Sequence, residues 1–189
     1  MEDQDRQLIE RIRAGDRGAF RQLVDRHKDV SLSLAFSILK DRDGAEEVLQ
    51  EVFLRVFEKL GSFRFRSSFR TWLYRIVVNT SYNALKTRKK YLPLEDFCLH
   101  TPVGARPADG PQSLQEEEQK KYITEAMKRL KPDEALVLRL FYLCDMRIKE
   151  IKKITGFGTA KIKVDLHRGR TNLQHQLKMM LGDELKNLL

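Results

Sequence analysis

A short run of the chain alternates aromatic rings with arginine. Residues 63–66 have the sequence FRFR. Aromatic rings stack on unpaired bases while guanidinium groups neutralise phosphates, so this composition is typical of surfaces that bind single-stranded nucleic acid. Packing in the core is the alternative role for aromatic residues. We favour that role for Phe69 and Trp72, and both roles stay open for Phe63 and Phe65.

The stretch after this run has apolar residues at helical spacing, which predicts a helix that starts after the cap pair Ser67 and Ser68 and runs towards Ala84. Its polar positions combine cations, which bind phosphates, with amides and a hydroxyl that can bind base edges. They are Arg70, Arg75, Asn79, Thr80, Asn83 and Lys86.

A second candidate site lies near the other end of the sequence. Residues 146–154 place apolar side chains on one face of a short helix, residues 156–158 (GFG) predict a tight turn, and Thr159 can cap the next helix. This pattern predicts a helix-turn-helix, whose second helix enters the major groove and presents Lys161, Lys163 and Arg168. An ordinary helical hairpin is the alternative.

A third feature is an acidic helix face. Apolar residues recur at helical spacing over residues 45–60, and Asp43 is placed to cap this helix. The outward positions carry Glu46, Glu47, Gln50 and Glu51. Such a face either complements the helix dipole or binds a basic protein partner. The pattern favours the first explanation without excluding the second.

A proline-rich segment separates the first two candidate sites. It holds four of the five prolines and carries one Lys or Arg against six Asp and Glu over residues 92–118, whereas both flanking blocks are basic. Prolines at this density forbid a continuous helix. We therefore predict an all-α protein of two small helical domains, residues 1–91 and 116–189, joined by an acidic linker, residues 92–115. The basic blocks predict nucleic-acid binding by both domains.

Several classes of protein are disfavoured. The 189 residues contain no apolar run of the roughly 18 needed to span a membrane, and the first residues are acidic, unlike a signal peptide, so we expect a cytoplasmic protein without membrane insertion. Cys98 and Cys144 are expected to be reduced thiols. The four histidines show no catalytic or metal-binding pattern, and no glycine-rich phosphate loop is present. We expect no enzyme activity, no metal and no cofactor.

Taken in order, these motifs resemble bacterial sigma factors of the sigma-70 family, and within it the extracytoplasmic function (ECF) group. The resemblance covers nearly the whole chain. It rests on residues 15–20 (GDRGAF), 43–53 (DGAEEVLQEVF), 69–79 (FRTWLYRIVVN), 149–151 (KEI), 154–156 (ITG) and 162–170 (IKVDLHRGR). Residue 65 departs from the pattern, since many members of the group have Gly where this chain has Phe65, and Lys152 stands where a small residue is usual.

The resemblance implies a subunit that binds core RNA polymerase and directs it to promoters. The acidic helix then docks on a coiled coil of the beta-prime subunit, and the beta subunit is a further contact. The implied polymerase-binding residues are Asp43, Glu46, Glu47, Gln50 and Glu51. Those implied for capture of an unpaired minus-10 base are Phe63, Arg64, Phe65, Arg66, Ser67, Arg75, Asn79, Asn83 and Lys86. Those implied for the minus-35 element are Thr159, Lys161, Lys163, His167, Arg168 and Arg170.

The resemblance also implies an anti-sigma factor as a partner. The main competing interpretation is a transcriptional regulator that binds duplex DNA through its helix-turn-helix and uses the first block only to dimerise. The two differ in a measurable way, because such a regulator binds promoter duplex alone whereas a sigma factor needs core polymerase.

Overall fold

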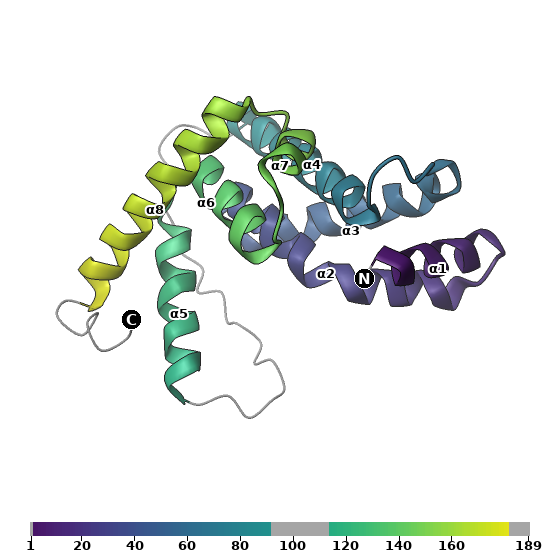
Figure 1. Ribbon diagram of the computed structural model, residues 1–189, viewed down its shortest axis with the longest axis horizontal. Coiled ribbons are helices and arrows are strands. Elements are labelled where there is room, and N and C mark those ends of the chain that lie inside the picture. The colour runs from purple at the N-terminus through teal and green to yellow at the C-terminus, as the bar shows by residue number, and fades with distance from the viewer. Residues whose placement is uncertain (1, 92–113, 182–189) are drawn as a thin grey trace.

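The computed structural model describes residues 2–91 and 114–181 of the chain (Figure 1). Within these residues every regular element is helical, as predicted, and no strand occurs. The elements in order are α1 (Glu2–Arg13), α2 (Arg17–Leu39), α3 (Arg42–Lys59), η1 (Leu60–Ser62), α4 (Phe69–Tyr91), α5 (Leu114–Lys128), α6 (Pro132–Leu138), η2 (Arg139–Leu143), α7 (Ile148–Thr155) and α8 (Thr159–Leu181). The predicted linker, apart from its last two residues, and Cys98 lie outside the described residues.

Helices α1 to α4 form the first bundle, with α2 packed against each of the other three. Helix α2 continues without a break through the polar run RHKD at residues 26–29. The reason is that His27 faces inward. Its Nε2 lies 3.1 Å from Asp5 Oδ1 and its ring packs edge-on against Phe69. Asp5 and His27 thus form a buried polar pair between α1 and α2.

The helix starts of this bundle follow the capping rules, with one shift. Ser68 Oγ accepts from Thr71 N at 3.1 Å and caps α4, as predicted. Helix α3 is capped by Asp41, whose Oδ2 accepts from Gly44 N at 3.0 Å, and not by Asp43. The predicted cap was therefore wrong by two residues, and Asp43 lies in the first helical turn, where its charge complements the helix dipole.

Helices α5 to α8 form the second half. Pro132 opens α6, and the chain then continues into a π-helical turn, η2. Helices α7 and α8 make the helix-turn-helix: Gly156 ends α7 with φ +75°, a conformation that glycine adopts readily. Ile151, Ile154 and Ile162 are fully buried between the two helices. Thr159, expected as a cap, is instead the first residue of α8.

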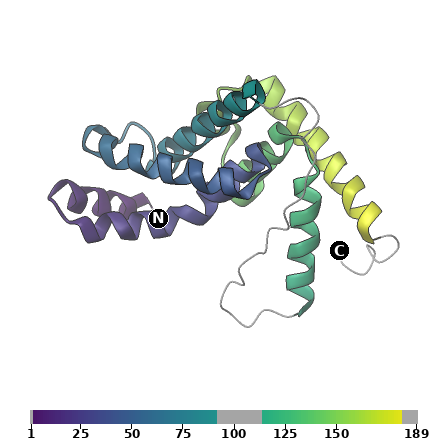
Figure 2. The same ribbon diagram turned by 180° about the vertical axis from the view of Figure 1, so that it is seen from behind.

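The two halves pack directly on each other. Helix α6 contacts α2, and α7 contacts α4, so that one apolar core runs through both halves. Figures 1 and 2 show α1 and the adjoining ends of α2 and α3 at one end of the molecule, and α5 with the C-terminal part of α8 projecting at the other. Across the described ranges, none of the helices combines the length and apolar character needed to cross a bilayer.

Candidate nucleic-acid and polymerase interfaces

The loop between η1 and α4 is built on a cluster of aromatic rings. Phe63 is only 6% exposed, and its ring centroid lies 4.9 Å from those of Phe65 and Trp72. Phe69 packs against the same cluster. The expectation that Phe63 contacts a base disagrees with this burial, because its ring faces the core. Phe63 supports the loop from within.

The polar members of the predicted minus-10 set are more accessible. Arg64 and Arg66 are exposed, and Ser67 is half-buried between them and the start of α4. Along α4, Arg75, Asn79, Asn83 and Lys86 are all exposed and are spaced by four, four and three residues. Side chains at this spacing line one face of a helix. The structure thus brings cations and amides into one continuous row that starts at the loop.

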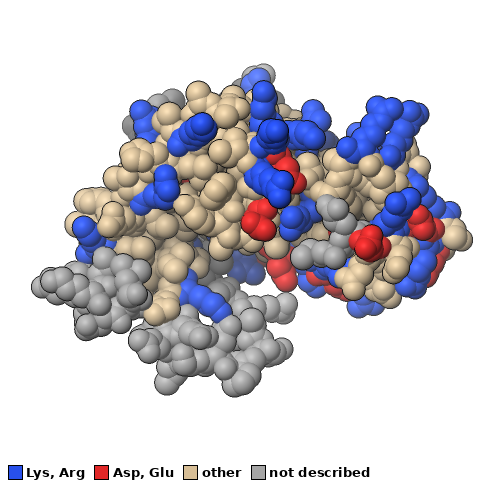
Figure 3. Space-filling model, in the orientation of Figure 1, with Lys and Arg blue, Asp and Glu red and all other residues tan. Residues whose placement is uncertain are grey.

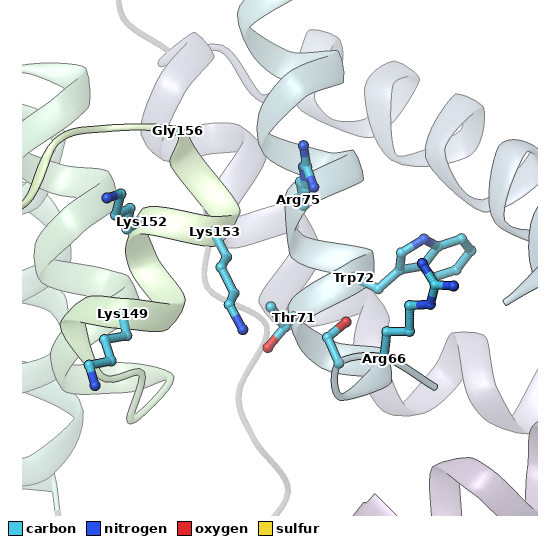
Figure 4. Close-up of a pocket in the computed structure, with 9 residues that line it drawn as sticks. Arg66, Thr71, Trp72, Arg75, Lys149, Lys152, Lys153 and Gly156 are labelled. Atoms are coloured by element: carbon cyan, nitrogen blue, oxygen red, sulfur yellow. The ribbon is translucent and has the colours of Figure 1, made fainter. Parts of the chain in front are cut away.

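Part of this row borders the helix-turn-helix. A hollow of about 690 Å³ separates the start of α4 from α7. Five cations line it, and none of the residues around it is a carboxylate: Arg66, Ser67, Thr71, Trp72, Arg75, Lys149, Lys152, Lys153 and Gly156. Figure 4 shows Lys153 extending from α7 towards Thr71. Figure 3 shows lysines and arginines spread over the face of the molecule seen in Figure 1, with acidic residues among them. Walls of one charge sign attract anionic ligands.

The predicted minus-35 residues fall on two faces of α8. Thr159, Lys163, His167 and Arg170 are exposed and lie along one side of the helix. Lys161 and Arg168 lie two helical turns apart on another side of α8, and both face the first bundle. Sequence reasoning placed all six on one reading surface. The structure separates them because the helix turns about 100° per residue.

Lys161 is held by two carboxylates. Its Nζ lies 2.7 Å from Asp133 Oδ2 and 2.7 Å from Asp165 Oδ2. Partial burial by itself lowers the pKa of the Lys161 ammonium group. Its hydrogen bonds to Asp133 and Asp165 and the charges of these carboxylates outweigh that effect and raise the pKa, so Lys161 stays charged. Its charge is also 4.4 Å from the Phe157 ring centroid.

A second hollow lies between α4 and α8, with a volume of about 740 Å³. Asn83 and Lys86 from the predicted minus-10 set line it together with Lys161 and Arg168 from the predicted minus-35 set. Tyr82 also lines this hollow, and its hydroxyl donates a hydrogen bond to Asp133 Oδ1. The two predicted DNA-binding helices therefore face each other across one cavity.

The acidic face of α3 is exposed along its length. Asp43, Glu47, Gln50 and Glu51 are exposed and Glu46 is half-buried. Three of the carboxylates have intramolecular partners: Glu46 bonds Arg42 at 2.8 Å, Glu51 bonds Arg55, and Glu47 lies 3.7 Å from Arg88. These partners are themselves surface side chains, so the acidic residues stay open to a binding protein.

Two apolar residues on α3 were missed or misplaced. Leu54 is 67% exposed and follows Glu47, Gln50 and Glu51 on the same face, so it offers that face an apolar anchor. Phe57 was expected in the core but is 52% exposed and packs edge-on against Phe20, also at the surface. The signal in the sequence for Leu54 was its helical spacing, three residues after Glu51 and four before Glu58.

The recognition helix carries a similar missed residue. Val164 is 44% exposed on α8, while its neighbours Ile162 and Leu166 are buried as predicted. An exposed apolar side chain on such a helix suits contact with the methyl group of thymine.

Among the described residues no group of three or more His, Cys, Asp or Glu side chains is placed to hold a metal ion.

Comparison with known families agrees with this arrangement. The model of sigma-70 region 2 matches residues 23–91, and the model of sigma-70 region 4 matches residues 120–173. The ECF RNA polymerase sigma factor SigW of Bacillus subtilis is 29% identical over 188 residues, which cover 94% of this chain and 99% of SigW. The chain is an ECF sigma factor. It acts with RNA polymerase in promoter-directed initiation of transcription.

Other relatives of this sigma factor support the assignment. The ECF sigma-E factor of Escherichia coli (strain K12) is 27% identical over 184 residues, 94% of this chain and 96% of that protein. Two solved structures share the fold. The sigma factor RpoE of Bartonella quintana, in complex with NepR, has a TM-score of 0.67 at 24% identity over 84% of this chain and 96% of that one. CnrH, in complex with the cytosolic domain of CnrY, has a TM-score of 0.62 at 21% identity over 93% and 98%.

These matches bear on the competing interpretation. A regulator that works without polymerase needs the first block only for dimerisation. The match of residues 23–91 to sigma-70 region 2 gives that block a sigma-factor role instead. The all-α fold with two domains is confirmed, while the boundaries at residues 91 and 115 stay predictions.

Proposed function

We propose that this sigma factor captures the minus-10 element with the loop at residues 63–68 and the exposed row on α4. The observation that carries the proposal is the row itself: Arg75, Asn79, Asn83 and Lys86 are all exposed on one helix face directly beyond the loop. Cations can hold the phosphates of a strand whose bases the amides bind. The exposed Arg64 and Arg66 extend the same surface.

The minus-35 element is assigned to α8. Thr159, Lys163, His167 and Arg170 form its freely exposed side, and Val164 adds an apolar contact. The second helix of a helix-turn-helix lies in the major groove, where such side chains meet base edges and phosphates. Lys161 and Arg168 lie on the other side of α8 and become accessible to DNA only when α8 moves away from α4.

Such a movement is part of the proposal. The two promoter elements are about 25 base pairs apart, roughly 85 Å along B-form DNA. Asn83 and Lys86 line the same cavity as Lys161 and Arg168, so the packed arrangement cannot place both sets on their elements. The two domains therefore have to separate when the sigma factor engages core polymerase and promoter.

The acidic face of α3 is assigned to core polymerase. Asp43, Glu47 and Glu51 supply negative charge to a basic coiled coil, and the Gln50 amide can add hydrogen bonds. Leu54 supplies the apolar contact that interface cores require. Charge alone gives little affinity when exposed pairs are screened by salt. The exposed leucine makes the face a more complete docking surface than the acidic residues alone.

An anti-sigma factor is the further proposed partner. Support comes from the two solved relatives, RpoE and CnrH, whose structures contain NepR and the cytosolic domain of CnrY. The basic hollow between α4 and α7 suits an acidic segment of such a protein. We also propose a cytoplasmic location, where the chromosome and polymerase are, and no catalytic activity, since sigma factors are not enzymes.

Promoter melting tests the main assignment. Asn79→Ala in the holoenzyme should leave closed-promoter binding nearly intact and reduce permanganate reactivity at the minus-10 element, because a base that leaves the stack has to be held. Asn79 is exposed, so the variant should fold normally. Gln22→Ala, an exposed amide on α2, is the control. If Asn79→Ala opens promoters at the wild-type rate, the row on α4 does not capture the minus-10 base.

A further inference from the structure

The loop at residues 63–68 is held at its base by helix α1, which none of the assignments above connects with DNA. Arg13, the last residue of α1, donates from Nη2 to Leu60 O over 3.2 Å and also to Phe63 O. These carbonyls lie at the two ends of η1. A single guanidinium group therefore fixes the place where the chain leaves α3 and enters the loop.

The same arginine also lies over the ring of Phe65. Arg13 Cζ is 5.1 Å from the ring centroid and Arg6 Cζ is 5.2 Å from it. Phe63 packs on the ring as well, with 4.9 Å between centroids. Cations at this distance are attracted to the face of an aromatic ring. Two arginines of α1 and one buried phenylalanine thus hold Phe65 in place.

Phe65 needs such contacts because of its backbone. Its φ is +52°, in the left-handed region that residues with a side chain rarely adopt. Unfavourable backbone conformations persist where the surrounding structure holds them. The residues on either side, Arg64 and Arg66, are both exposed, and the backbone at Phe65 sets the directions in which they leave the chain.

We propose that Arg13 is a positioning residue for minus-10 recognition. It fixes Phe65 and the base of the loop, and thereby fixes how Arg64 and Arg66 are presented to the unpaired strand. The inference rests on the proposed function of the loop. Arg13 acts without touching DNA, and its contribution is to the choice of base rather than to overall affinity.

Base selectivity is the measurement that separates positioning from a general structural role. Four promoter templates that differ at one base of the minus-10 element are opened by holoenzyme carrying the full chain, and the ratio of the fastest to the slowest opening rate is compared. Arg13→Gln should lower this ratio about fivefold, since it removes one of the two cations over Phe65 and weakens the bonds to two carbonyls. Arg13→Lys keeps the charge without the two-carbonyl geometry and should give an intermediate ratio.

A second variant tests the route through Phe65. Phe65→Gly removes the ring and permits the positive φ, so Arg13→Gln should lower the ratio less in this background than in wild type. Arg17→Gln replaces an exposed arginine four residues along the chain and serves as the matched control. Thermal unfolding of each variant confirms that it is folded.

The outcomes are distinct. The proposal is overturned if Arg13→Gln leaves the ratio unchanged, or if it slows all four templates equally, which is the behaviour of a residue that only stabilises the domain. It is also overturned if the effects of Arg13→Gln and Phe65→Gly simply add. Failure of the loop assignment itself shows differently, as opening of all four templates at the wild-type rates when the exposed Arg64 and Arg66 are both changed to Ala.

Discussion

The hydroxyl of Tyr82 donates a hydrogen bond to Asp133 Oδ1 over 2.5 Å and so joins α4 to the first turn of α6. Burial and the neighbouring carboxylate both raise the pKa of Tyr82, which keeps the phenol protonated and able to donate. The other oxygen of Asp133 accepts from Lys161 over 2.7 Å. One carboxylate therefore holds the helix assigned to the minus-10 element and the helix assigned to the minus-35 element at the same time.

Loss of that carboxylate should favour the separated domains. Asp133→Asn weakens both contacts, a change of about 1 to 2 kcal/mol for a hydrogen bond and a partly exposed ion pair. We expect the free sigma factor to become more extended in small-angle X-ray scattering and to bind minus-35 duplex more tightly. Asp29→Asn on the surface of α2 is the control. Identical scattering profiles for Asp133→Asn and wild type would contradict the role of this contact.

Charge reversal on α3 should prevent docking on polymerase. We expect Glu47→Lys combined with Glu51→Lys to abolish co-purification with core enzyme, and Leu54→Ala alone to weaken it, because all three side chains are exposed on the same face. A double change is needed, since a single exposed ion pair contributes about 0 to 1 kcal/mol. Asp25→Lys with Asp29→Lys on α2 is the matched control. Normal co-purification of the α3 variant would remove this face from the polymerase interface.

Gly44 should be sensitive to the smallest side chain. A Cβ there would collide with the guanidinium group of Arg88, so Arg88 has to move away from its ion pair with Asp41. Loss of this partly exposed ion pair costs about 1 kcal/mol, which offsets the roughly 1 kcal/mol that Ala gains over Gly within a helix, so Gly44→Ala should bring no net gain in the free energy of unfolding. Gly61→Ala, where a Cβ meets nothing within 4 Å, should have no such cost. Urea unfolding compares the two.

The role of Arg88 in the effect of Gly44→Ala can be tested separately. If the displaced ion pair offsets the gain, Gly44→Ala should raise the free energy of unfolding in an Arg88→Ala background, where no guanidinium group occupies that space. An equal effect in both backgrounds would assign the result to the backbone of α3 instead.

The free energy of unfolding should change with pH in the alkaline range because of Lys40, which contacts α5 from the end of α2. Burial, and then the nearby charge of Arg139, lower the pKa of Lys40 to about 8, while its Nζ donates to Met127 O over 3.1 Å. Below pH 8 the amine is protonated in both the folded and unfolded states, so the cost of burying the charge is fully present. Between pH 8 and the unfolded pKa of 10.5 the folded state loses its proton first, and stability rises.

The measurement is a difference between two proteins. Relative to Lys40→Met, the wild-type free energy of unfolding should rise by about 2 kcal/mol between pH 7.5 and pH 9.5 in urea titrations. The comparison is needed because burial raises the pKa of Cys144 to about 11, which acts in the opposite direction at high pH in both proteins. Parallel curves for the two proteins would show that Lys40 is not buried as a charge.

The helices and the helix-turn-helix could be predicted from the sequence because their signals are local. Apolar spacing, the cap at Ser68, Pro132 at a helix start and Gly156 at a turn each act over a few residues. The fate of Phe63 was not local. It depends on Trp72, on Phe69 and on Arg13 of α1, which lies 50 residues away along the chain. Composition identified the loop, and only packing decided which ring faces the core.

The same distinction applies to the charged residues. Helical spacing correctly indicated the exposed acidic face of α3, but Asp41 rather than Asp43 caps the helix, since both lie near the start and only backbone geometry separates them. Lys161 has the sequence context of a DNA-binding residue, and its partner Asp133 lies 28 positions earlier, on a different helix. Pairings of this kind follow from how the domains pack.

The ion pairs of Lys161 affect how strongly the DNA affinity of the free sigma factor depends on salt concentration. Each phosphate that a lysine neutralises releases condensed counterions, and contributes about 0.9 to the slope of log affinity against log salt. Lys161 already carries Asp133 and Asp165 as its counter-charges in the packed form. The packed form therefore displaces fewer ions from duplex DNA than the lysines and arginines of α8 suggest, and binds DNA without sequence preference more weakly in dilute salt.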